Sequence, residues 1–169
     1  VLYSSPLAGQ WLSYFDDQFL FVSLLDKKIK DDLIVRLYPE DYGWDQHDRW
    51  KDKFPELKIN NGRDNLNKYL KSSKLCISTY NATTFLESFR MNIPTVIYWN
   101  TLHWEIRESA IPFFKDLENV GIFHKSPKSA AVHINSIWED VDLWWNSNEV
   151  QNALRKFMKK YCHFDQNSH

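Results

Sequence analysis

The architecture of this chain is set by residues 75–99, which read Leu75-Cys-Ile-Ser-Thr-Tyr-Asn-Ala-Thr-Thr-Phe-Leu-Glu-Ser-Phe-Arg-Met-Asn-Ile-Pro-Thr-Val-Ile-Tyr-Trp99. The stretch opens with a short apolar run, continues through a turn dense in hydroxyl and amide side chains, and ends with a β-branched run after Pro94. Between the turn and Pro94, apolar residues recur at helical spacing. The pattern predicts a strand, a helix and a second strand, and parallel strands need a crossover of this length.

The turn at residues 78–84, here called the hydroxyl-rich turn, has the groups to hold an anion, and we expect a phosphate. A helix N-terminus offers unpaired backbone N–H groups and the positive end of the helix dipole. Side-chain donors gather at the same place: Ser78, Thr79, Asn81, Thr83 and Thr84. Glu87 lies one helical turn further on, so it could accept hydrogen bonds from sugar hydroxyls. The alternative is that the cluster only caps the helix, with Thr84 and Glu87 forming a capping box.

Several motifs, in this order along the chain, resemble the C-terminal, nucleotide-sugar-binding half of GT-B glycosyltransferases. The resemblance spans nearly the whole chain and rests on residues 79–95 together with Val35-Arg36-Leu37-Tyr38-Pro39-Glu40, Gly121-Ile122-Phe123-His124-Lys125-Ser126-Pro127 and Trp144-Trp145. More narrowly, these motifs are similar to a family of transferases of bacterial surface-carbohydrate biosynthesis. The resemblance implies that the hydroxyl-rich turn holds the donor's phosphate and that Glu87 takes the ribose hydroxyls.

The other elements extend the same α/β pattern. Six apolar, strand-like runs alternate with helical patterns, at residues 1–5, 33–38, 57–60, 75–77, 94–99 and 121–124. This alternation favours a Rossmann-like, doubly wound parallel sheet of about six strands with helices on both faces, which is one half of a GT-B fold. We expect one donor-binding domain over residues 1–169. Because the chain is short for a two-domain enzyme and begins at Val1 without Met, we expect a C-terminal fragment of a longer protein.

Composition narrows the classes of partner and compartment. Lys and Arg total 21 against 22 for Asp and Glu, so no global basic field exists for nucleic acid. No apolar run is long enough for a transmembrane helix, and no signal peptide is recognisable at the start. Cys76 and Cys162 are too far apart in sequence to make a disulfide framework or a zinc motif. We expect a cytoplasmic protein, free in solution or at the inner face of the membrane.

Three charged residues outside the hydroxyl-rich turn are further candidates for donor binding. Arg36 is a permanent charge inside an apolar run, so it either faces solvent or directs its guanidinium at the donor phosphate or the carboxylates of the site. The loop after the fifth strand reaches the sheet edge where ligands bind in open α/β folds, so His103, Trp104, Glu105 and Arg107 are placed to line the same cleft. Of these, Glu105 and Arg107 are the binding candidates. The resemblance implies contacts there with the donor's base or sugar. The alternative for Glu105 is a favourable interaction with a helix dipole.

A metal site is not expected. Asp45, His47 and Asp48 could surround a cation, but no second ligand cluster at helical spacing accompanies them. A solvated loop or a short helix explains these residues better. The leaving phosphate of GT-B enzymes is stabilised by a helix dipole and side chains, so the resemblance implies no required metal or cofactor.

The leading hypothesis is the donor-binding domain of a glycosyltransferase, which moves a sugar from a nucleotide-activated donor to a growing surface glycan. The donor is expected to be a UDP- or CMP-linked sugar and the acceptor a glycan or a lipid-linked glycan. The catalytic base is expected on the N-terminal domain of the longer protein, and none is assigned in this chain. Two alternatives stay open: a nucleotide-sugar epimerase or polyol-phosphate transferase on the same fold, and a non-catalytic assembly domain with Trp residues as interface anchors.

Overall fold

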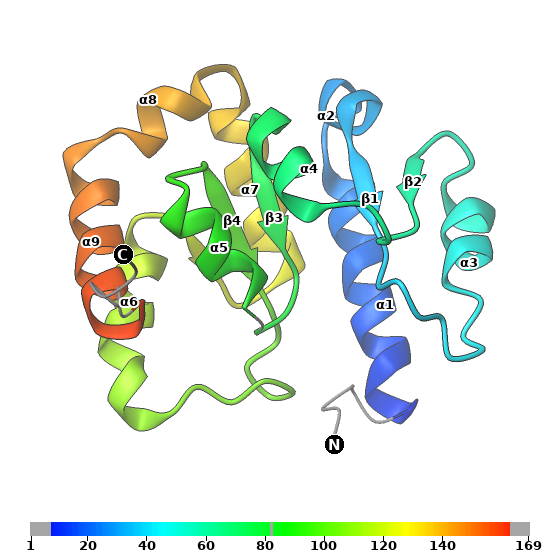
Figure 1. Ribbon diagram of the computed structural model, residues 1–169, viewed down its shortest axis with the longest axis horizontal. Coiled ribbons are helices and arrows are strands. Elements are labelled where there is room, and N and C mark those ends of the chain that lie inside the picture. The colour runs from blue at the N-terminus through cyan, green and yellow to red at the C-terminus, as the bar shows by residue number, and fades with distance from the viewer. Residues whose placement is uncertain (1–7, 82, 163–169) are drawn as a thin grey trace, which may run out of the picture.

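The structure is a computed structural model that describes residues 8–81 and 83–162, with side chains from Gln10 onward. Helices and strands alternate along it (Figure 1), in the following order: α1 (Ala8–Leu24), α2 (Lys27–Asp32), β1 (Ile34–Arg36), α3 (Gln46–Lys53), β2 (Lys58–Asn60), α4 (Leu66–Ser72), β3 (Cys76–Ser78), α5 (Thr84–Arg90), β4 (Thr95–Tyr98), the 3₁₀ helix η1 (Glu108–Ala110), α6 (Ile111–Asn119), β5 (Phe123–His124), α7 (Pro127–Ile137), the 3₁₀ helix η2 (Trp138–Asp140), α8 (Val141–Trp145) and α9 (Asn148–Tyr161).

The strands form two small parallel sheets. β1 pairs with β2, with Val35 opposite Ile59, whereas β4 lies between β3 and β5 in a three-stranded sheet. The helical crossover after β3 leads into a parallel β4, which confirms the strand, helix and strand predicted for residues 75–99. In Figure 1, α5 lies in front of the three-stranded sheet and α7 behind it.

The expectation of a single sheet of about six strands is wrong for the described residues, which contain five strands in two sheets. β1 and β3 share no ladder, although Val35 and Ile77 pack against the same core. The apolar run 33–38 is longer than β1 because pairing extends only a little beyond Arg36, through Leu37 N–H to Asn60 O at 2.9 Å, before Pro39 interrupts it. The strand expected at residues 1–5 lies outside the described residues.

β4 separates two hydrophobic cores. Side chains of a strand alternate between its faces, so Val96 and Tyr98 enter one core while Ile97 and Trp99, the latter just past the strand, enter the other. The first core is built mainly by α1 and α7, and the second by α5, α6 and α9. Every residue of β4 is buried, so its carboxyl end is a firm base for the loop that follows.

A helix that could cross a membrane would need a long, apolar surface. Within residues 8–81 and 83–162, no helix has the required combination of length and apolar character.

Candidate functional site

A cavity of about 190 Å³ opens at the carboxyl ends of β3 and β4, which is where open parallel sheets bind their ligands. α1 forms one wall, and the residues that follow the two strands form the other. The residues that line it are Gln10, Ser13, Tyr14, Asp17, Thr79, Tyr98, Trp99, Asn100, His103 and Trp104. The cavity and the hydroxyl-rich turn meet at Thr79, which alone among the described residues of the turn lines the cavity.

A hydrogen bond between Tyr14 and Thr79 joins the two walls. The Tyr14 hydroxyl lies 2.7 Å from Thr79 Oγ1, and this bond connects α1 to the start of the hydroxyl-rich turn. Burial raises the pKa of Tyr14 well above its usual value, although the bond to Thr79 lowers it. The phenol therefore stays protonated at neutral pH and can donate a hydrogen bond.

Two buried polar groups at the cavity lack partners among the described residues. The Tyr98 hydroxyl and the Trp99 indole N–H make no hydrogen bond, although Tyr98 is only 1% exposed and Trp99 only 2%. Burial raises the pKa of Tyr98, and the neighbouring Tyr14 and Asp17 raise it further, so this hydroxyl is also protonated. A buried polar group without a partner costs about 1–3 kcal/mol, and a polar ligand in the cavity could recover that cost.

Asp17 and His103 face the cavity from opposite walls. Burial raises the pKa of the Asp17 carboxyl, as does Asp16, whereas the field of His103 lowers it. The carboxylate accepts hydrogen bonds from hydroxyl or amide groups and repels phosphate. This part of the site therefore suits an uncharged, hydroxylated ring, with Trp104 as an aromatic surface beside it.

The residues predicted in the hydroxyl-rich turn occupy different positions. Ser78 ends β3 and is buried, with its hydroxyl donating to Tyr80 O at 3.4 Å. Thr79 lines the cavity. Asn81 and Thr83 precede α5 and are exposed, whereas Thr84 and Glu87 lie in its first turn, with Thr84 half-buried and Glu87 exposed.

The capping explanation of this turn is wrong in its assignment. The residue that caps α5 is Thr83, not Thr84, and its side chain makes no capping hydrogen bond. Glu87 lies in the first turn of α5, as predicted, and is exposed to solvent. The hydroxyl of Thr83 is therefore not used to hold the helix end.

Arg36 does not line the cavity. Its guanidinium donates to Asn60 Oδ1 at 2.7 Å and to Gly62 O at 2.6 Å, and it also bonds Asp64 O. The Tyr69 ring lies 5.4 Å from the guanidinium carbon. These contacts tie β1 to the loop between β2 and α4, and the structure does not bring Arg36 together with the hydroxyl-rich turn.

Of the four residues expected to line the cleft from the loop after β4, two line the cavity, and they are not the two that were carried forward as binding candidates. Glu105 and Arg107 are exposed and do not line the cavity, whereas His103 and Trp104 do. A turn explains why His103 and Trp104 line the cavity. Asn100 O accepts from both His103 N–H and Trp104 N–H, and this folds that part of the loop back toward the sheet.

Sequence reasoning missed Tyr14, Asp17 and Tyr98 as site residues. The helical spacing of Trp11, Phe15 and Phe19 indicates only a helix that packs on the sheet, and the apolar run around Tyr98 indicates only a buried strand. One signal was present: Tyr14 and Asp17 are spaced i, i+3 and lie off the Trp11, Phe15 and Phe19 stripe. Both residues are half-buried, and this spacing places the phenol and the carboxylate on the same face of the helix.

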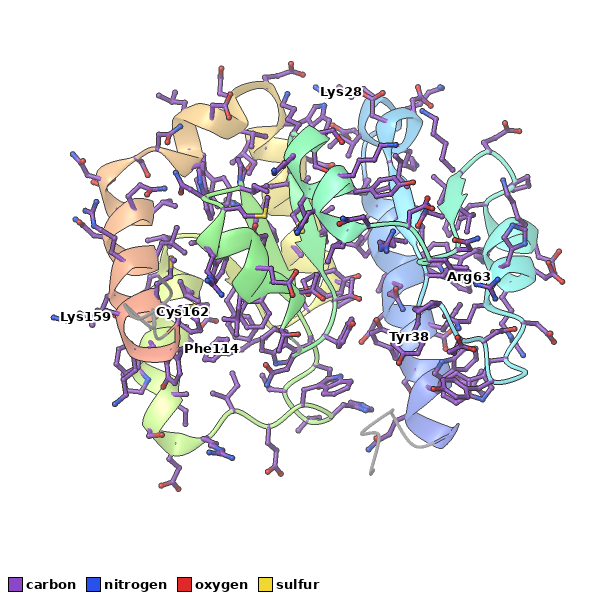
Figure 2. The ribbon with its side chains drawn as sticks, in the orientation of Figure 1. Lys28, Tyr38, Arg63, Phe114, Lys159 and Cys162 are labelled. Atoms are coloured by element: carbon purple, nitrogen blue, oxygen red, sulfur yellow. The ribbon has the colours of Figure 1, made fainter. Side chains whose placement is uncertain are left out.

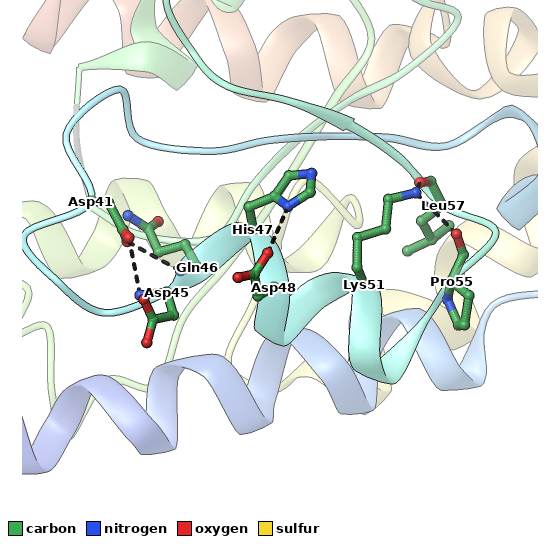
Figure 3. Close-up of polar contacts among 8 residues, drawn as sticks. All are labelled: Asp41, Asp45, Gln46, His47, Asp48, Lys51, Pro55 and Leu57. Carbon is green, nitrogen blue, oxygen red and sulfur yellow. Dashed lines mark hydrogen bonds and ion pairs between the residues drawn. The ribbon is translucent and has the colours of Figure 1, made fainter.

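Asp45, His47 and Asp48 lie near the start of α3 and are exposed, and His47 Nδ1 lies 3.1 Å from Asp48 Oδ1 (Figure 3). In the part of the chain that the structure describes, no group of three or more His, Cys, Asp or Glu side chains could hold a metal ion.

The comparisons with known proteins identify a family. Residues 1–168 match the family model described as LIC12162 family transferase. No curated protein matches the chain, and no solved structure does. The match covers almost every residue, and the chain belongs to the LIC12162 family of transferases.

Proposed function

We propose that this chain is the donor-binding domain of a glycosyltransferase, which transfers a sugar from a nucleotide-activated donor to a surface glycan. The observation that carries the proposal is the cavity at the carboxyl ends of β3 and β4. It is lined by Tyr98, whose hydroxyl has no partner among the described residues, and it shares Thr79 with the hydroxyl-rich turn. Membership of a transferase family restricts the reaction to group transfer, and the proposal names a glycosyl group.

The donor would lie with its phosphates at the hydroxyl-rich turn and its sugar in the cavity. The phosphates rest against the exposed Asn81 and Thr83 and the backbone at the start of α5, while Glu87 accepts hydrogen bonds from the ribose. The uncharged sugar enters the cavity beside Asp17 and Tyr98. This direction follows from charge, because a phosphate placed next to Asp17 would be repelled.

In the reaction, the bond between the sugar's anomeric carbon and the phosphate oxygen breaks, and an acceptor oxygen forms the new bond to that carbon. The leaving phosphate keeps the bonding electrons, and donors at the hydroxyl-rich turn stabilise its charge without a required metal or cofactor. The acceptor hydroxyl loses its proton to a base, which we expect on the N-terminal domain of a longer protein.

Calorimetric titration with UDP, CMP, GDP and ADP in EDTA tests the donor site. We expect one nucleotide to bind, and we expect Thr83→Ala and Glu87→Gln each to weaken it about tenfold, because a hydrogen bond to a charged group is worth about 1.5–3 kcal/mol. Glu149→Gln is the matched control, since Glu149 is also exposed in the first turn of a helix.

Two results would contradict the proposal. One is that no nucleotide binds although circular dichroism confirms a folded protein. The other is that a nucleotide binds with the same affinity to the wild type and to both turn variants. Binding of ribitol phosphate in place of every nucleotide would instead identify a polyol-phosphate transferase.

A further inference from the structure

The outer face of the last helix, α9, is basic. Its apolar face is buried in the second core. The opposite face is exposed and carries four cations: Arg155, Lys156, Lys159 and Lys160. We call these four side chains the basic face of α9. Glu149, in the first turn, is the only acidic residue of the helix. Because the chain as a whole has a net charge of −1, the basic face is a local concentration of positive charge.

Two of these cations have no partner among the described residues. Lys156 Nζ lies 2.5 Å from Asp116 Oδ2, and Arg155 donates to Asn152. Lys159 and Lys160 make no hydrogen bond or ion pair within residues 8–81 and 83–162. Figure 2 shows Lys159 pointing away from the body of the molecule. The charge at this end of the basic face is therefore available to a partner.

The helix dipole does not account for the whole basic face. Cations in the last turn of a helix are stabilised by its dipole, and Lys159 and Lys160 lie in the last turn of α9. Arg155 and Lys156 lie a turn earlier, where the dipole has little effect. The four cations therefore share a face for a reason other than the stability of the helix end.

Two aromatic side chains border the basic face where α6 packs against α9. Phe113 and Tyr161 are half-buried, with ring centroids 5.4 Å apart, and Lys156 Nζ lies 5.8 Å from the Phe113 ring centroid. The Tyr161 hydroxyl donates to Ser109 O at 3.4 Å. Tyrosine and lysine both combine an apolar body with a polar tip, and such side chains suit the headgroup region of a lipid bilayer.

The chemistry of the basic face selects among negatively charged partners. None of the large, exposed apolar side chains of the described residues belongs to α9, so the face lacks the apolar centre of a protein interface. Nucleic acid requires a basic surface that follows many phosphates, and the nearly balanced charge of the chain does not supply one. Four cations on an amphipathic helix are sufficient for a membrane surface, because mobile lipid headgroups gather around them. We propose that the basic face of α9 binds the surface of a bilayer that contains anionic lipids.

Binding of this kind is peripheral and electrostatic. The apolar face of α9 stays in the second core, so the helix does not enter the hydrocarbon of the bilayer. Each Lys or Arg near an anionic membrane raises the affinity about fivefold. Residues of α9 do not line the cavity at the carboxyl ends of β3 and β4. Membrane binding goes beyond the proposed function and does not depend on it.

Co-sedimentation with lipid vesicles in about 0.05 M NaCl tests the proposal. The vesicles contain phosphatidylcholine alone, or phosphatidylcholine with about one-third phosphatidylglycerol. We expect binding only to the vesicles with phosphatidylglycerol, and release at about 0.5 M NaCl, because salt screens exposed charges. Lys159→Gln/Lys160→Gln should bind about twentyfold more weakly than the wild type, whereas Lys159→Arg/Lys160→Arg, which keeps both charges, should bind within about twofold of it.

A matched control removes the same charge elsewhere. Lys53 and Lys71 are also exposed lysines in the last turns of helices, in α3 and α4. Lys53→Gln/Lys71→Gln has the same net charge as Lys159→Gln/Lys160→Gln, and its binding should fall by less than about threefold.

Four results would overturn the proposal. The wild type does not sediment with phosphatidylglycerol vesicles, or it binds phosphatidylcholine alone equally well. The control variant and Lys159→Gln/Lys160→Gln lose the same affinity, which would show that only net charge matters. A single-stranded oligonucleotide binds the basic face and the vesicles do not, which would identify a nucleic-acid site. Nucleotide titration is independent of all four, so a failure here leaves the donor site standing.

Discussion

At the carboxyl end of β1, the polar Arg36 side chain is fully engaged, with acceptors on Asn60, Gly62 and Asp64. At the carboxyl end of β4, the Tyr98 hydroxyl is buried without any partner among the described residues. The two strand ends lie on the side of the sheets where ligands bind in α/β folds. Arg36 is thus a polar group that holds loops together, whereas the Tyr98 hydroxyl is a polar group without a structural role. The predictions below test this contrast.

The largest effect is expected at Gly62, whose carbonyl accepts from Arg36. A Cβ atom there would lie 2.1 Å from Leu37 O, and φ is +79°, so Gly62→Ala should lower the free energy of unfolding by about 3 kcal/mol or more. Gly43 is the matched control because its φ is +77° but nothing lies within 4 Å, so Gly43→Ala should cost only about 1 kcal/mol. Urea denaturation of both variants measures the difference, and equal losses would mean that the loop around Gly62 yields easily.

His133 Nε2 is a third buried polar atom without a hydrogen-bond partner among the described residues, and its burial should make stability depend on pH. Burial, together with the smaller effect of the nearby His124, lowers the pKa of His133 to about 4. The unfolded chain takes up this proton below about pH 6.5 and the folded protein only near pH 4. Stability should therefore be unaffected above pH 6.5 and fall by about 2 kcal/mol between pH 6.5 and 4, after allowance for partial exposure.

Urea denaturation across that window compares the wild type with His133→Leu, in which the fall should be smaller. Substitution of the exposed His47 by Leu is the control. If His133→Leu and the wild type lose stability in parallel as the pH falls, His133 does not bind its proton in the way described.

The smallest effect gives the clearest contrast, because one substitution should have opposite signs at two tyrosines. Tyr98→Phe removes a hydroxyl without a partner, so the free energy of unfolding should rise by about 1 kcal/mol. Tyr69→Phe removes a hydroxyl that donates to Asp64 at 2.9 Å and accepts from Asn60 at 2.8 Å, so stability should fall by about 1 kcal/mol.

Binding provides the second part of the same contrast. In calorimetry, Tyr98→Phe should weaken the binding of a nucleotide sugar more than the binding of the free nucleotide, because only the sugar enters the cavity. Loss of stability in Tyr98→Phe would show that the hydroxyl has a partner after all, and equal weakening of both ligands would place the sugar elsewhere.

Local sequence patterns predicted the elements better than their assembly. A Ser-Pro pair favours a helix start, and Ser126 does cap α7, accepting from Ser129 N–H, with Pro127 as the first residue of that helix. Periodicity also located the strands, but it carries no information on which strand edges pair. Pairing is a long-range property. For this reason the sequence pattern predicted one large sheet, whereas the described residues form two.

The same limit of local sequence patterns explains why only part of the candidate site was predicted. Thr79 and the start of α5 are local features, and their sequence was informative. The acceptors of Arg36 lie 24 to 28 residues away in sequence, and no local pattern indicated them. Tyr14 and Asp17 become site residues only because α1 lies against the ends of β3 and β4.

The position of β4 between two cores has a consequence for motion at the site. Local opening of this strand would expose both cores at once, so its amides should exchange with solvent only when the whole protein unfolds. The part of the cavity that β4 forms therefore unfolds only together with the whole protein. Entry and exit of a ligand must depend on the exposed segments around the cavity. Motion of these loops, and not of β4, would then limit the rate of turnover.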